Sequence, residues 1–476
     1  MMMDLRRAAS FLPGCMLVGD AGTQLRRVHS DSRSLQAGDL FVAIRGDNFD
    51  GNGFLAQARA AGAAAALAHD ADALRAAGLS GLVVADTRQA LGLLATRWRE
   101  QFSLPLIAVT GSNGKTTVTQ MLATILRHWM PDASLATHGN FNNDIGLPLT
   151  LLRLRAEHRV AVVELGMNHA GEIALLAGMA QPTVALINNA QREHLEFMAT
   201  VEAVAQENGA VIDSLPADGV AVFPHDDPFA PTWRTRAGQR PLMEFAIATS
   251  PHGNSGVSVR AAAPLWRDGA WQVQADTPAG ALVFSLPMAG LHNVHNALAA
   301  ASGAIAAGAP LKHVAAGLRS FEPVKGRSRT QQLAWGGQAR TLVDDSYNAN
   351  PDSVDAALAM LAMLPGPHLM VLGDMGEVGE QGPQFHAQAG ARAHALGIDF
   401  LFTMGDLSAH ATAPFPGARH FDTMPDLVAA VLAQMPRVSS VLVKGSRSMR
   451  MERVVEALVA GAGKSNGATT GEAACC

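Results

Sequence analysis

The stretch LIAVTGSNGKTTVTQMLATIL, residues 106–126, decides the fold of this chain. A short apolar run is followed by the glycine-containing turn GSNG and then by Lys115 and Thr116. Apolar residues then recur at helical spacing: Val118, Met121, Leu122, Ile125. The order of strand, glycine turn, lysine and helix is that of a phosphate-binding loop. One residue departs from the general pattern G-x-x-x-x-G-K-[ST], because Val109 stands where the first glycine is expected.

The chemistry of this turn suits a nucleoside triphosphate. Glycines let backbone N–H groups turn inward around phosphate oxygens, and a helix N-terminus adds positive potential. Lys115 supplies a compact charge for the phosphates, and the Thr116 hydroxyl can hold Mg²⁺. The residues predicted to bind the nucleotide here are Gly111, Ser112, Asn113, Gly114, Lys115, Thr116 and Thr117. The alternative is an ordinary glycine-rich turn with a surface lysine.

Length and composition set the broad class. A chain of 476 residues is long enough for about three domains. A net charge of −5 gives no field for general nucleic-acid or membrane binding, and no apolar run has the length of a membrane helix. Three cysteines form no disulfide framework or metal motif, so we expect a cytoplasmic protein. Only five of the 36 basic residues are lysines, so a remaining lysine is expected to do what arginine cannot.

The pattern along the chain predicts an α/β protein of three domains. Residues 1–102 mix short strands with Ala-rich helices, and we expect a small mixed α/β N-terminal domain. Residues 103–322 alternate buried strands with helices, which predicts a central parallel sheet that carries the phosphate loop. Residues 323–462 repeat that alternation and predict a C-terminal Rossmann-like domain. Residues 463–476 are small and polar, and are predicted to be a disordered tail.

Charged residues follow several predicted strands. Glu164 ends one strand and His194 follows another, so both are expected beside the phosphate loop, the first as a Mg²⁺ ligand and the second for a second ion. Helix capping and solvent exposure are the alternatives. Asp344 and Asp345 follow a strand of the third block, where acids often bind ribose hydroxyls. Four basic residues on glycine turns are candidates to neutralise phosphates or a carboxylate: Lys325, Arg327, Lys444 and Arg447.

Read together, these motifs resemble the Mur ligase family over residues 28–460. The resemblance rests on VTGSNGKTT, which is similar to the shortened phosphate loop of that family, and on HSDSRSLQAGDLFVAIRGDNFDGNGF near the N-terminus. It also rests on GNFNNDIGLPLTLL, VVELGMNHAGEI, HNVHNALAAA, DDSYNANPDS, LGDMGEVGE and VLVKGSRSMRME. Any one string is weak, but their number and order make the resemblance specific.

The resemblance implies a reaction. It is strongest to the branch that uses ATP and Mg²⁺ to join D-alanyl-D-alanine to UDP-N-acetylmuramoyl-tripeptide through an acyl phosphate, in peptidoglycan precursor synthesis. The resemblance implies that Lys115, Glu164 and His194 are catalytic, and that Thr116, Glu164 and His194 hold metal. It further implies that Asn293 and Asn296 lie near adenine, Asp345 at the ribose, and Arg327 at the nucleotide from the third domain. The implied UDP-sugar residues are Ser32, Arg33, Arg45 and Asp50, and the implied muramoyl-peptide residues are Asn142 and Asn143. We expect a monomer in which the three domains close before chemistry. Tyr347, Asn348 and Asn350 are open candidates for binding D-Ala-D-Ala.

One residue departs from the family. Many members carry a carbamylated lysine about 14 residues after the histidine, where this chain reads VAQENGAVI. No lysine occurs between Lys115 and Lys312, so a carbamate in the central domain is excluded. Glu207, Asn208 or water would substitute, or a second metal would be held loosely.

Rival readings remain open at this point. A related amide ligase, such as folylpolyglutamate synthase or the branch that adds the third peptide residue, is the nearest one. The N-terminal region argues against the folate enzyme, and the D-N-P-R sequence of the other branch is absent. A phosphate-loop switch or transport ATPase, and a non-catalytic nucleotide-binding relative, belong to other classes. The sequence does not identify the third residue of the peptide.

Overall fold

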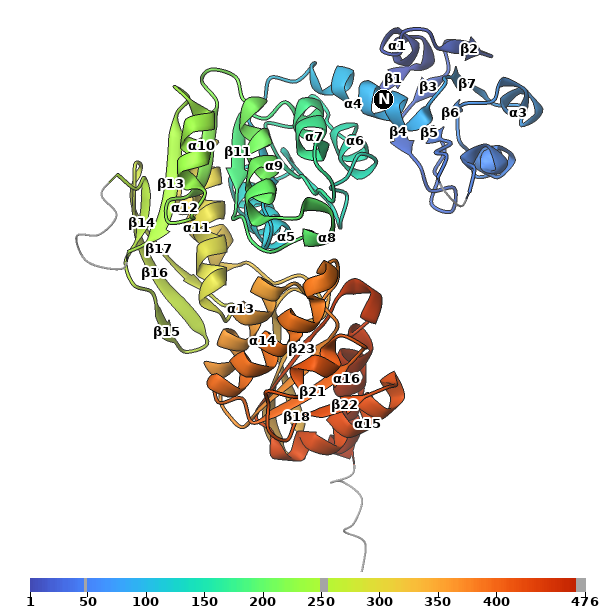
Figure 1. The fold of residues 1–476 in the computed structure, drawn as a ribbon. Coiled ribbons are helices and arrows are strands. Elements are labelled where there is room, and N and C mark those ends of the chain that lie inside the picture. Colours follow the sequence, from blue (N-terminus) through green and yellow to red (C-terminus); the bar gives the residue numbers. More distant parts are fainter. Residues whose placement is uncertain (47–48, 249–255, 468–476) are drawn as a thin grey trace, which may run out of the picture.

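The computed structural model describes residues 1–46, 49–248 and 256–467. Figure 1 shows three parts in chain order: the N-terminal strands and helices in blue, a central part in cyan to yellow, and a C-terminal part in orange to red. Each part has its own principal sheet. The chain is an α/β protein with mostly parallel sheets, as predicted.

The N-terminal sheet has the order β2-β7-β6-β5-β4. All its pairings are parallel except that of β2 with β7, and a separate antiparallel pair joins β1 to β3. The strands are β1 Met3–Asp4, β2 Met16–Val18, β3 Gln24–Leu25, β4 Arg27–His29, β5 Asp39–Val42, β6 Ala65–Ala68 and β7 Ser80–Val83. The helices are α1 Leu5–Ser10, α2 Leu55–Ala60, α3 Ala71–Ala76 and α4 Thr87–Arg99. The strand predicted within DLFVAIRG is β5.

The central sheet has ten strands, and β8 to β14 pair in parallel in the order β14-β13-β12-β11-β8-β10-β9. The strands are β8 Leu106–Thr110, β9 Ser134–Ala136, β10 Val160–Glu164, β11 Val184–Ile187, β12 Val220–Pro224, β13 Leu242–Ile247 and β14 Val259–Ala261. An antiparallel extension, not predicted from the sequence, adds β15 Leu265–Arg267, β16 Ala270–Thr277 and β17 Gly280–Leu286.

Helices cover both faces of the central sheet because successive strand residues point to opposite sides. Ile107 and Val109 pack with α5, α11 and α12, whereas Leu106 and Ala108 pack with the helices of the other face. The helices are α5 Lys115–Trp129, α6 Gly146–Leu151, α7 Glu172–Ala180, α8 Leu195–Met198, α9 Val201–Asp213, α10 Ala230–Ala237, α11 Leu291–Ala306 and α12 Leu311–Arg319. The predicted strand–loop–helix unit is therefore present as β8 and α5.

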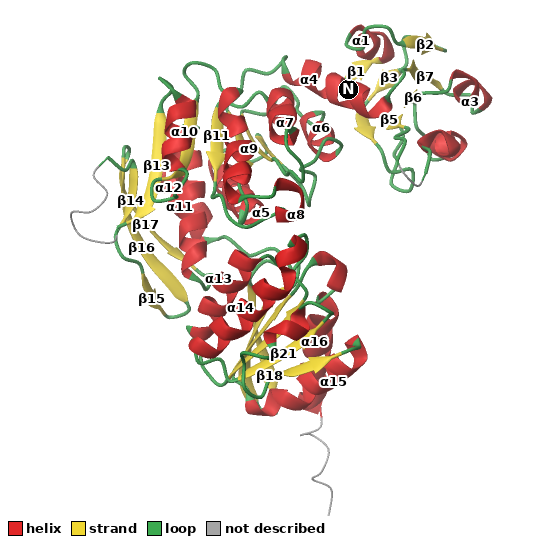
Figure 2. Cartoon of the chain, in the orientation of Figure 1, coloured by secondary structure: helices red, strands yellow, loops and turns green. Residues whose placement is uncertain are grey.

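The C-terminal sheet has the order β18-β19-β23-β20-β21-β22 and is parallel except for the β18–β19 pair. Helices α13 and α14 cover one face, and α15 and α16 cover the other; Figure 2 shows helices around these strands. The strands are β18 Arg329–Trp335, β19 Gln338–Asp345, β20 His368–Gly373, β21 Phe400–Met404, β22 Arg419–Phe421 and β23 Ser440–Lys444. The helices are α13 Pro351–Ala362, α14 Gly382–Ala395, α15 Met424–Gln434 and α16 Glu452–Gly467.

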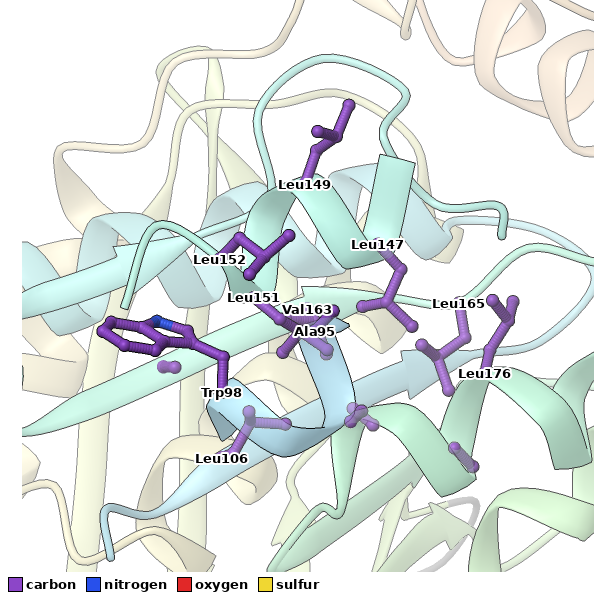
Figure 3. Close-up of a cluster of buried hydrophobic side chains, with 14 of the residues drawn as sticks. Ala95, Trp98, Leu106, Leu147, Leu149, Leu151, Leu152, Val163, Leu165 and Leu176 are labelled. Carbon is purple, nitrogen blue, oxygen red and sulfur yellow. The ribbon is translucent and has the colours of Figure 1, made fainter. Parts of the chain in front are cut away.

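Helix α4 connects the N-terminal part to the central part and packs on the central sheet. Its buried residues Ala95 and Trp98 lie with Leu106 of β8 and Leu147 of α6 in one apolar cluster (Figure 3). Leu94 of the same helix belongs to this cluster. Besides α6, α4 packs against α7. This helix therefore anchors the N-terminal sheet to the body that carries the phosphate loop.

The end of the chain differs from the prediction in part. Residues 463–467, predicted to begin a disordered tail, continue the helix α16, which ends at Gly467. The small residues that suggested disorder directly follow an apolar helix face, and the helix continues into them. The rest of the predicted tail, 468–476, lies outside the described residues. Within 1–46, 49–248 and 256–467, no helix has both the length and the apolar character needed to cross a bilayer.

Candidate functional site

A cleft of about 1270 Å³ lies between the carboxyl ends of the central strands and the C-terminal sheet. The phosphate loop, Glu164, His194 and α11 line it from the central part, and Arg327, Asp345 and the start of α13 line it from the C-terminal part. Ligand sites of open parallel sheets lie beyond the carboxyl ends of the strands. The cleft therefore gathers the predicted nucleotide-binding residues except Gly111, which does not line it.

The phosphate loop connects β8 to α5 through two glycines in left-handed conformations. Gly111 has φ +130° and Gly114 has φ +81°. A Cβ added at Gly114 would come within 2.4 Å of Asn296 Oδ1 and 2.5 Å of Asn188 Nδ2. Glycine is thus required at position 114 both by its backbone angle and by the close approach of two amides. Ser112 is held by Gln191, whose N–H donates to Ser112 Oγ at 2.9 Å.

The side chain of Lys115 is folded into the loop. Its Nζ donates to the carbonyl oxygens of Gly111 at 2.7 Å and Ser112 at 2.9 Å. It also donates to both carboxylate oxygens of Glu193, at 3.0 and 3.2 Å. Both side chains are largely buried, being 13% and 9% exposed. An incoming phosphate therefore has to compete with Glu193 for the lysine.

Glu164, at the end of β10, has the features of a magnesium ligand. Its Oε1 accepts hydrogen bonds from Thr116 Oγ1 at 3.2 Å and from Asn142 Nδ2 at 2.7 Å. Its Oε2 is buried and makes no hydrogen bond. A buried carboxylate oxygen without a partner is costly unless a cation or a ligand donor satisfies it. The oxygen ligands of Thr116 and Glu164 match the preference of Mg²⁺.

The ring of His194 is already paired with carboxylates, unlike that of a histidine that is free to bind a metal. Its ring forms ion pairs with Glu193, at 3.5 Å, and with Glu377 of the C-terminal part. Burial alone would lower the pKa of His194, but the two carboxylates raise it to about 9. The ring is therefore protonated at neutral pH in this arrangement, and metal binding would require it to release that proton and rearrange. Among the described residues, no group of three or more His, Cys, Asp or Glu side chains is arranged to hold a metal.

The two predicted asparagines of α11 belong to a network of amides. Asn296 Nδ2 donates to Asn293 Oδ1 at 3.1 Å, and Asn188 Nδ2 donates to Asn296 Oδ1 at 2.9 Å. Asn188 Nδ2 also donates to the carbonyl of Asn113 in the phosphate loop at 2.7 Å. Asn113 N–H in turn donates to Asn189 Oδ1 at 2.8 Å. The amides connect the start of α11 to the loop that would hold the phosphates.

Asp345 and Arg327 both face the cleft from the C-terminal part. Asp345 accepts from Lys444 Nζ at 2.5 Å and from Ser328 N at 2.8 Å. Burial alone would raise the pKa of Asp345, but the charge of Lys444 lowers it below the usual range of aspartate. The guanidinium of Arg327 lies 4.0 Å from the ring centroid of Tyr347. Stacking on an aromatic face holds this cation at the cleft and leaves its charge available to a ligand.

The predicted UDP-sugar residues form a separate group. Ser32, Arg33, Arg45 and Asp50 lie in the loops that follow β4 and β5 of the N-terminal part, and they are not among the residues that line the large cleft. Arg33 pairs with Asp31, and Asp50 bonds to His69 Nε2 at 3.0 Å. By contrast, both predicted muramoyl-peptide residues, Asn142 and Asn143, line the cleft. Asn143 Oδ1 accepts from Gly146 N at 2.9 Å, at the start of α6.

The residues at and beside the position of the missing lysine have structural contacts. Asn208 is fully buried, and its Oδ1 accepts from Thr110 Oγ1 at 2.7 Å and from Gly111 N at 3.0 Å. The carboxylate of Glu207 accepts from Gly171 N at 2.9 Å and from Ile173 N at 2.8 Å, at the start of α7. In this structure Asn208 fixes the phosphate loop and Glu207 caps a helix.

Several cleft residues were not predicted from the sequence. Glu193 precedes His194 directly, so a carboxylate beside a candidate histidine was an available signal. Arg88 reaches the cleft from α4 and pairs with Asp144, at 2.7 Å from Nη2 to Oδ1. Asn188 and Asn189 directly follow β11 at the same sheet edge as the phosphate loop, and this position could have indicated them.

Family models match most of the chain. The Mur ligase family catalytic domain model matches residues 24–99, the Mur ligase middle domain model 109–304, and the Mur ligase glutamate ligase domain model 328–447. Their order along the chain is also the order of the three sheets.

Full-length relatives agree with these models. The chain is 40% identical to UDP-N-acetylmuramoyl-tripeptide–D-alanyl-D-alanine ligase of Escherichia coli (strain K12), over 92% of this chain and 94% of that protein. It is 36% identical to the ligase of the same name from Haemophilus influenzae, over 93% and 95%.

Solved structures are similar over the same range. A crystal structure of MurF from Acinetobacter baumannii has a TM-score of 0.82 at 36% identity and covers 92% of this chain and 94% of that one. MurF ligase from Thermotoga maritima, in complex with ADP, has a TM-score of 0.79 at 25% identity and covers 92% and 98%. On the family models, the full-length relatives and the shared three-part architecture, the chain belongs to the Mur ligase family.

Proposed function

We propose that this chain is an ATP-dependent ligase that joins D-alanyl-D-alanine to UDP-N-acetylmuramoyl-tripeptide, a step of peptidoglycan precursor synthesis. The terminal carboxylate of the tripeptide attacks the γ-phosphorus of ATP, ADP leaves, and an acyl phosphate forms. The amine of D-Ala-D-Ala then attacks the acyl carbon, phosphate leaves, the nitrogen loses a proton, and an amide results. Relatives that bear the name of this ligase match over nearly the whole chain.

One observation carries the proposal. A single cleft holds the phosphate loop, the buried Glu164 with an unpartnered oxygen, and Arg327 from the C-terminal part. Two anions, ATP and a carboxylate, have to approach each other in the reaction. Positive groups from two sides of the cleft offset their repulsion, which is the main requirement of phosphoryl transfer.

The nucleotide is proposed to bind between the central and C-terminal parts. Lys115 and the loop amides would bind the phosphates, with Thr117 at the adjacent turn of α5. Asn293 and Asn296 would face adenine, Asp345 the ribose, and Arg327 the phosphates. Thr116 and Glu164 would hold Mg²⁺, which when bound offsets the negative charge between phosphate oxygens. His194 would join a second site only after leaving its two carboxylates.

The second substrate is proposed to span the N-terminal and central parts. Ser32, Arg33, Arg45 and Asp50 would bind the UDP-sugar, and Asn142 and Asn143 would guide the peptide toward the cleft. In support, Asn142 already donates to Glu164, so the peptide path ends beside the proposed Mg²⁺ residues. Arg88 pairs with Asp144 next to that path and offers a further charge there.

The division of the chain is proposed to follow its three sheets. We assign 1–102 to UDP-sugar binding, 103–322 to ATP binding and 323–462 to the C-terminal domain. The element order supports these limits, since the α4–β8 connection contains residue 102 and the α12–β18 connection contains residue 322. We further propose a monomer that acts in the cytoplasm, where its nucleotide substrates are made.

The direct test is phosphate release from ATP in the presence of UDP-N-acetylmuramoyl-tripeptide, with and without D-Ala-D-Ala. We expect release to require both substrates and the product to gain a dipeptide by mass spectrometry. Release that does not depend on D-Ala-D-Ala would contradict the ligase proposal and favour a switch or transport ATPase.

Lys115→Ala tests the phosphate loop within the same assay. Turnover should fall by at least about 10³-fold because a buried phosphate charge loses its cation, while calorimetric binding of the UDP-linked substrate stays unchanged. Lys312→Ala is the matched control, since this lysine lies on α12 and does not line the cleft. Full activity of Lys115→Ala would refute the assignment of the loop.

A further inference from the structure

The C-terminal part contacts the phosphate loop directly through a pair of amides. Asn350 Nδ2 donates to Asn113 Oδ1 at 2.8 Å, and Asn113 Nδ2 donates to Asn350 Oδ1 at 3.3 Å. The two residues lie 237 positions apart in the chain. Asn350 is buried, so water does not compete freely for these hydrogen bonds.

Asn350 also fixes the start of the helix that follows it. It is the N-cap of α13, and its Oδ1 accepts from Ser353 N at 2.9 Å. The Ser353 hydroxyl accepts from Asn350 N at 3.0 Å, which completes a capping box. The side chain that contacts the phosphate loop is therefore itself immobilised by the helix.

A second contact lies two residues further along the chain. Asp352, in the first turn of α13, accepts from Arg192 N at 2.7 Å and from Arg192 Nη2 at 2.7 Å. Hydrogen bonding to Asp352 raises the pKa of Arg192 above its usual range. Arg192 follows the β11 loop that includes Asn188 and Asn189, so the same helix start holds both the phosphate loop and its neighbour.

These contacts extend the amide network across the border between the two parts. Asn113 is held by Asn188 and Asn189 on the central side and by Asn350 on the other side. A shift of the phosphate loop would therefore be transmitted to α13. Because α13 packs against β20 and β23, it would be transmitted to the sheet whose strand β19 ends in Asp345.

We propose that Asn350 and Asp352 are positioning residues, which hold the C-terminal sheet in register with the phosphate loop so that Arg327 and Asp345 meet the nucleotide. The inference rests on the proposed function, because it concerns the rate of that reaction. Neither side chain needs to touch a reacting atom. Their effect passes through Asn113 and Arg192, and it aligns two halves of one site.

The test compares two acids of α13. Asp352→Asn removes the charge that pairs with Arg192, whereas Asp355→Asn removes a charge that pairs with Arg392 inside the C-terminal part. We expect Asp352→Asn to lower kcat at least about 10-fold, with the KM values of ATP and D-Ala-D-Ala changed less than about 3-fold. Asp355→Asn should match the unchanged enzyme, and Asp352→Glu should restore part of kcat.

Asn350→Ser is a second test, which does not depend on the ion pair between Asp352 and Arg192. Serine is a good N-cap and keeps α13 capped, but it is too short to reach Asn113. We expect kcat to fall with both KM values retained. A rise confined to the KM of D-Ala-D-Ala would overturn the proposal, since it would mean that Asn350 binds the dipeptide.

Small-angle scattering of the nucleotide-free chains supplies a readout besides activity. Asp352→Asn and Asn350→Ser should increase the radius of gyration relative to Asp355→Asn, because the C-terminal part is released. Equal radii together with equal kcat in all three variants would overturn the proposal. If the unchanged enzyme made no product, the proposed function would fail by itself, and the scattering would still decide whether these residues hold the two parts together.

Discussion

The central part of this ligase meets its two neighbours in different ways. Toward the N-terminal part, α4 buries Leu91, Leu94 and Trp98 in the same apolar cluster as the central sheet; Figure 3 shows Trp98 in this cluster. We call this contact the apolar border. Toward the C-terminal part, side-chain amides and ion pairs dominate, and we call this contact the polar border. The C-terminal apolar cluster takes in one buried central residue, Ala289, with Leu195 and Trp266 only partly buried against it.

The difference between the two borders suits two tasks, which are to hold one border together and to let the other open. Apolar burial is non-directional and is lost only when the surfaces separate, so the apolar border fixes the N-terminal sheet to the phosphate-loop body. Hydrogen bonds and ion pairs exchange with water at a small net cost, so the polar border can part and re-form. In the proposed reaction, ATP has to enter between the central and C-terminal parts, and the labile acyl phosphate has to be kept from water afterwards. A border that opens is needed on that side.

The largest expected effect is at the apolar border. Leu94→Ala should lower the free energy of unfolding by about 2–5 kcal/mol, because Leu94 is fully buried and its loss leaves a cavity. Leu93→Ala is the matched control on the same helix, since Leu93 is 37% exposed, and it should cost less than about 1 kcal/mol. Urea titration measures both. Equal costs would contradict the burial of one face of α4.

How much of the fold and of the site could be predicted from the sequence depends on the range of each contact. The meeting of Thr116 and Glu164 was predictable, because β8 and β10 are parallel neighbours whose carboxyl ends share one edge. The strand β16 could have been predicted from the sequence but was not. Trp271, Val273 and Ala275 are buried and alternate with exposed residues, which is the period of a half-buried strand.

The polar border could not be predicted in this way. Asn350 in a strand-to-helix turn reads equally well as a helix cap, which it also is. Its second role depends on how two sheets are placed, and no local pattern specifies that. The position of Glu193 beside His194 was an available signal, but Glu193 could also have faced solvent. Its contact with Lys115 follows from the path of the loop between β11 and α8.

A pH change should affect the polar border at His292. This histidine lies on α11 and faces Asp345 and Lys444 of the C-terminal part, with His295 on its own helix. Burial, together with the charges of Lys444 and His295, lowers the pKa of His292 to about 4 against the opposing effect of Asp345. Because the folded pKa lies below the unfolded value of about 6.5, stability is full above pH 6.5 and is lost as the pH falls toward 4.

His292→Gln isolates this contribution. Between pH 6.5 and 4 the unchanged protein should lose on the order of 1–2 kcal/mol more than the variant, because only the former takes up a proton at this site. Thermal unfolding midpoints of both proteins across that range measure the difference. Parallel curves would show that His292 is not buried as a neutral ring.

The smallest expected effect concerns a polar contact at the apolar border. Asp144 pairs there with Arg88 of α4, and the two side chains are 25% and 53% exposed. If apolar burial fixes this border, Asp144→Asn should lower the free energy of unfolding by no more than about 1 kcal/mol, because solvent screens a partly exposed pair. Asp72→Asn, which breaks an exposed pair with Arg75 inside α3, sets the baseline near zero. A cost for Asp144→Asn comparable to that of Leu94→Ala would mean that the ion pair, and not the apolar cluster, joins the N-terminal part to the phosphate-loop body, and the contrast between the two borders would then disappear.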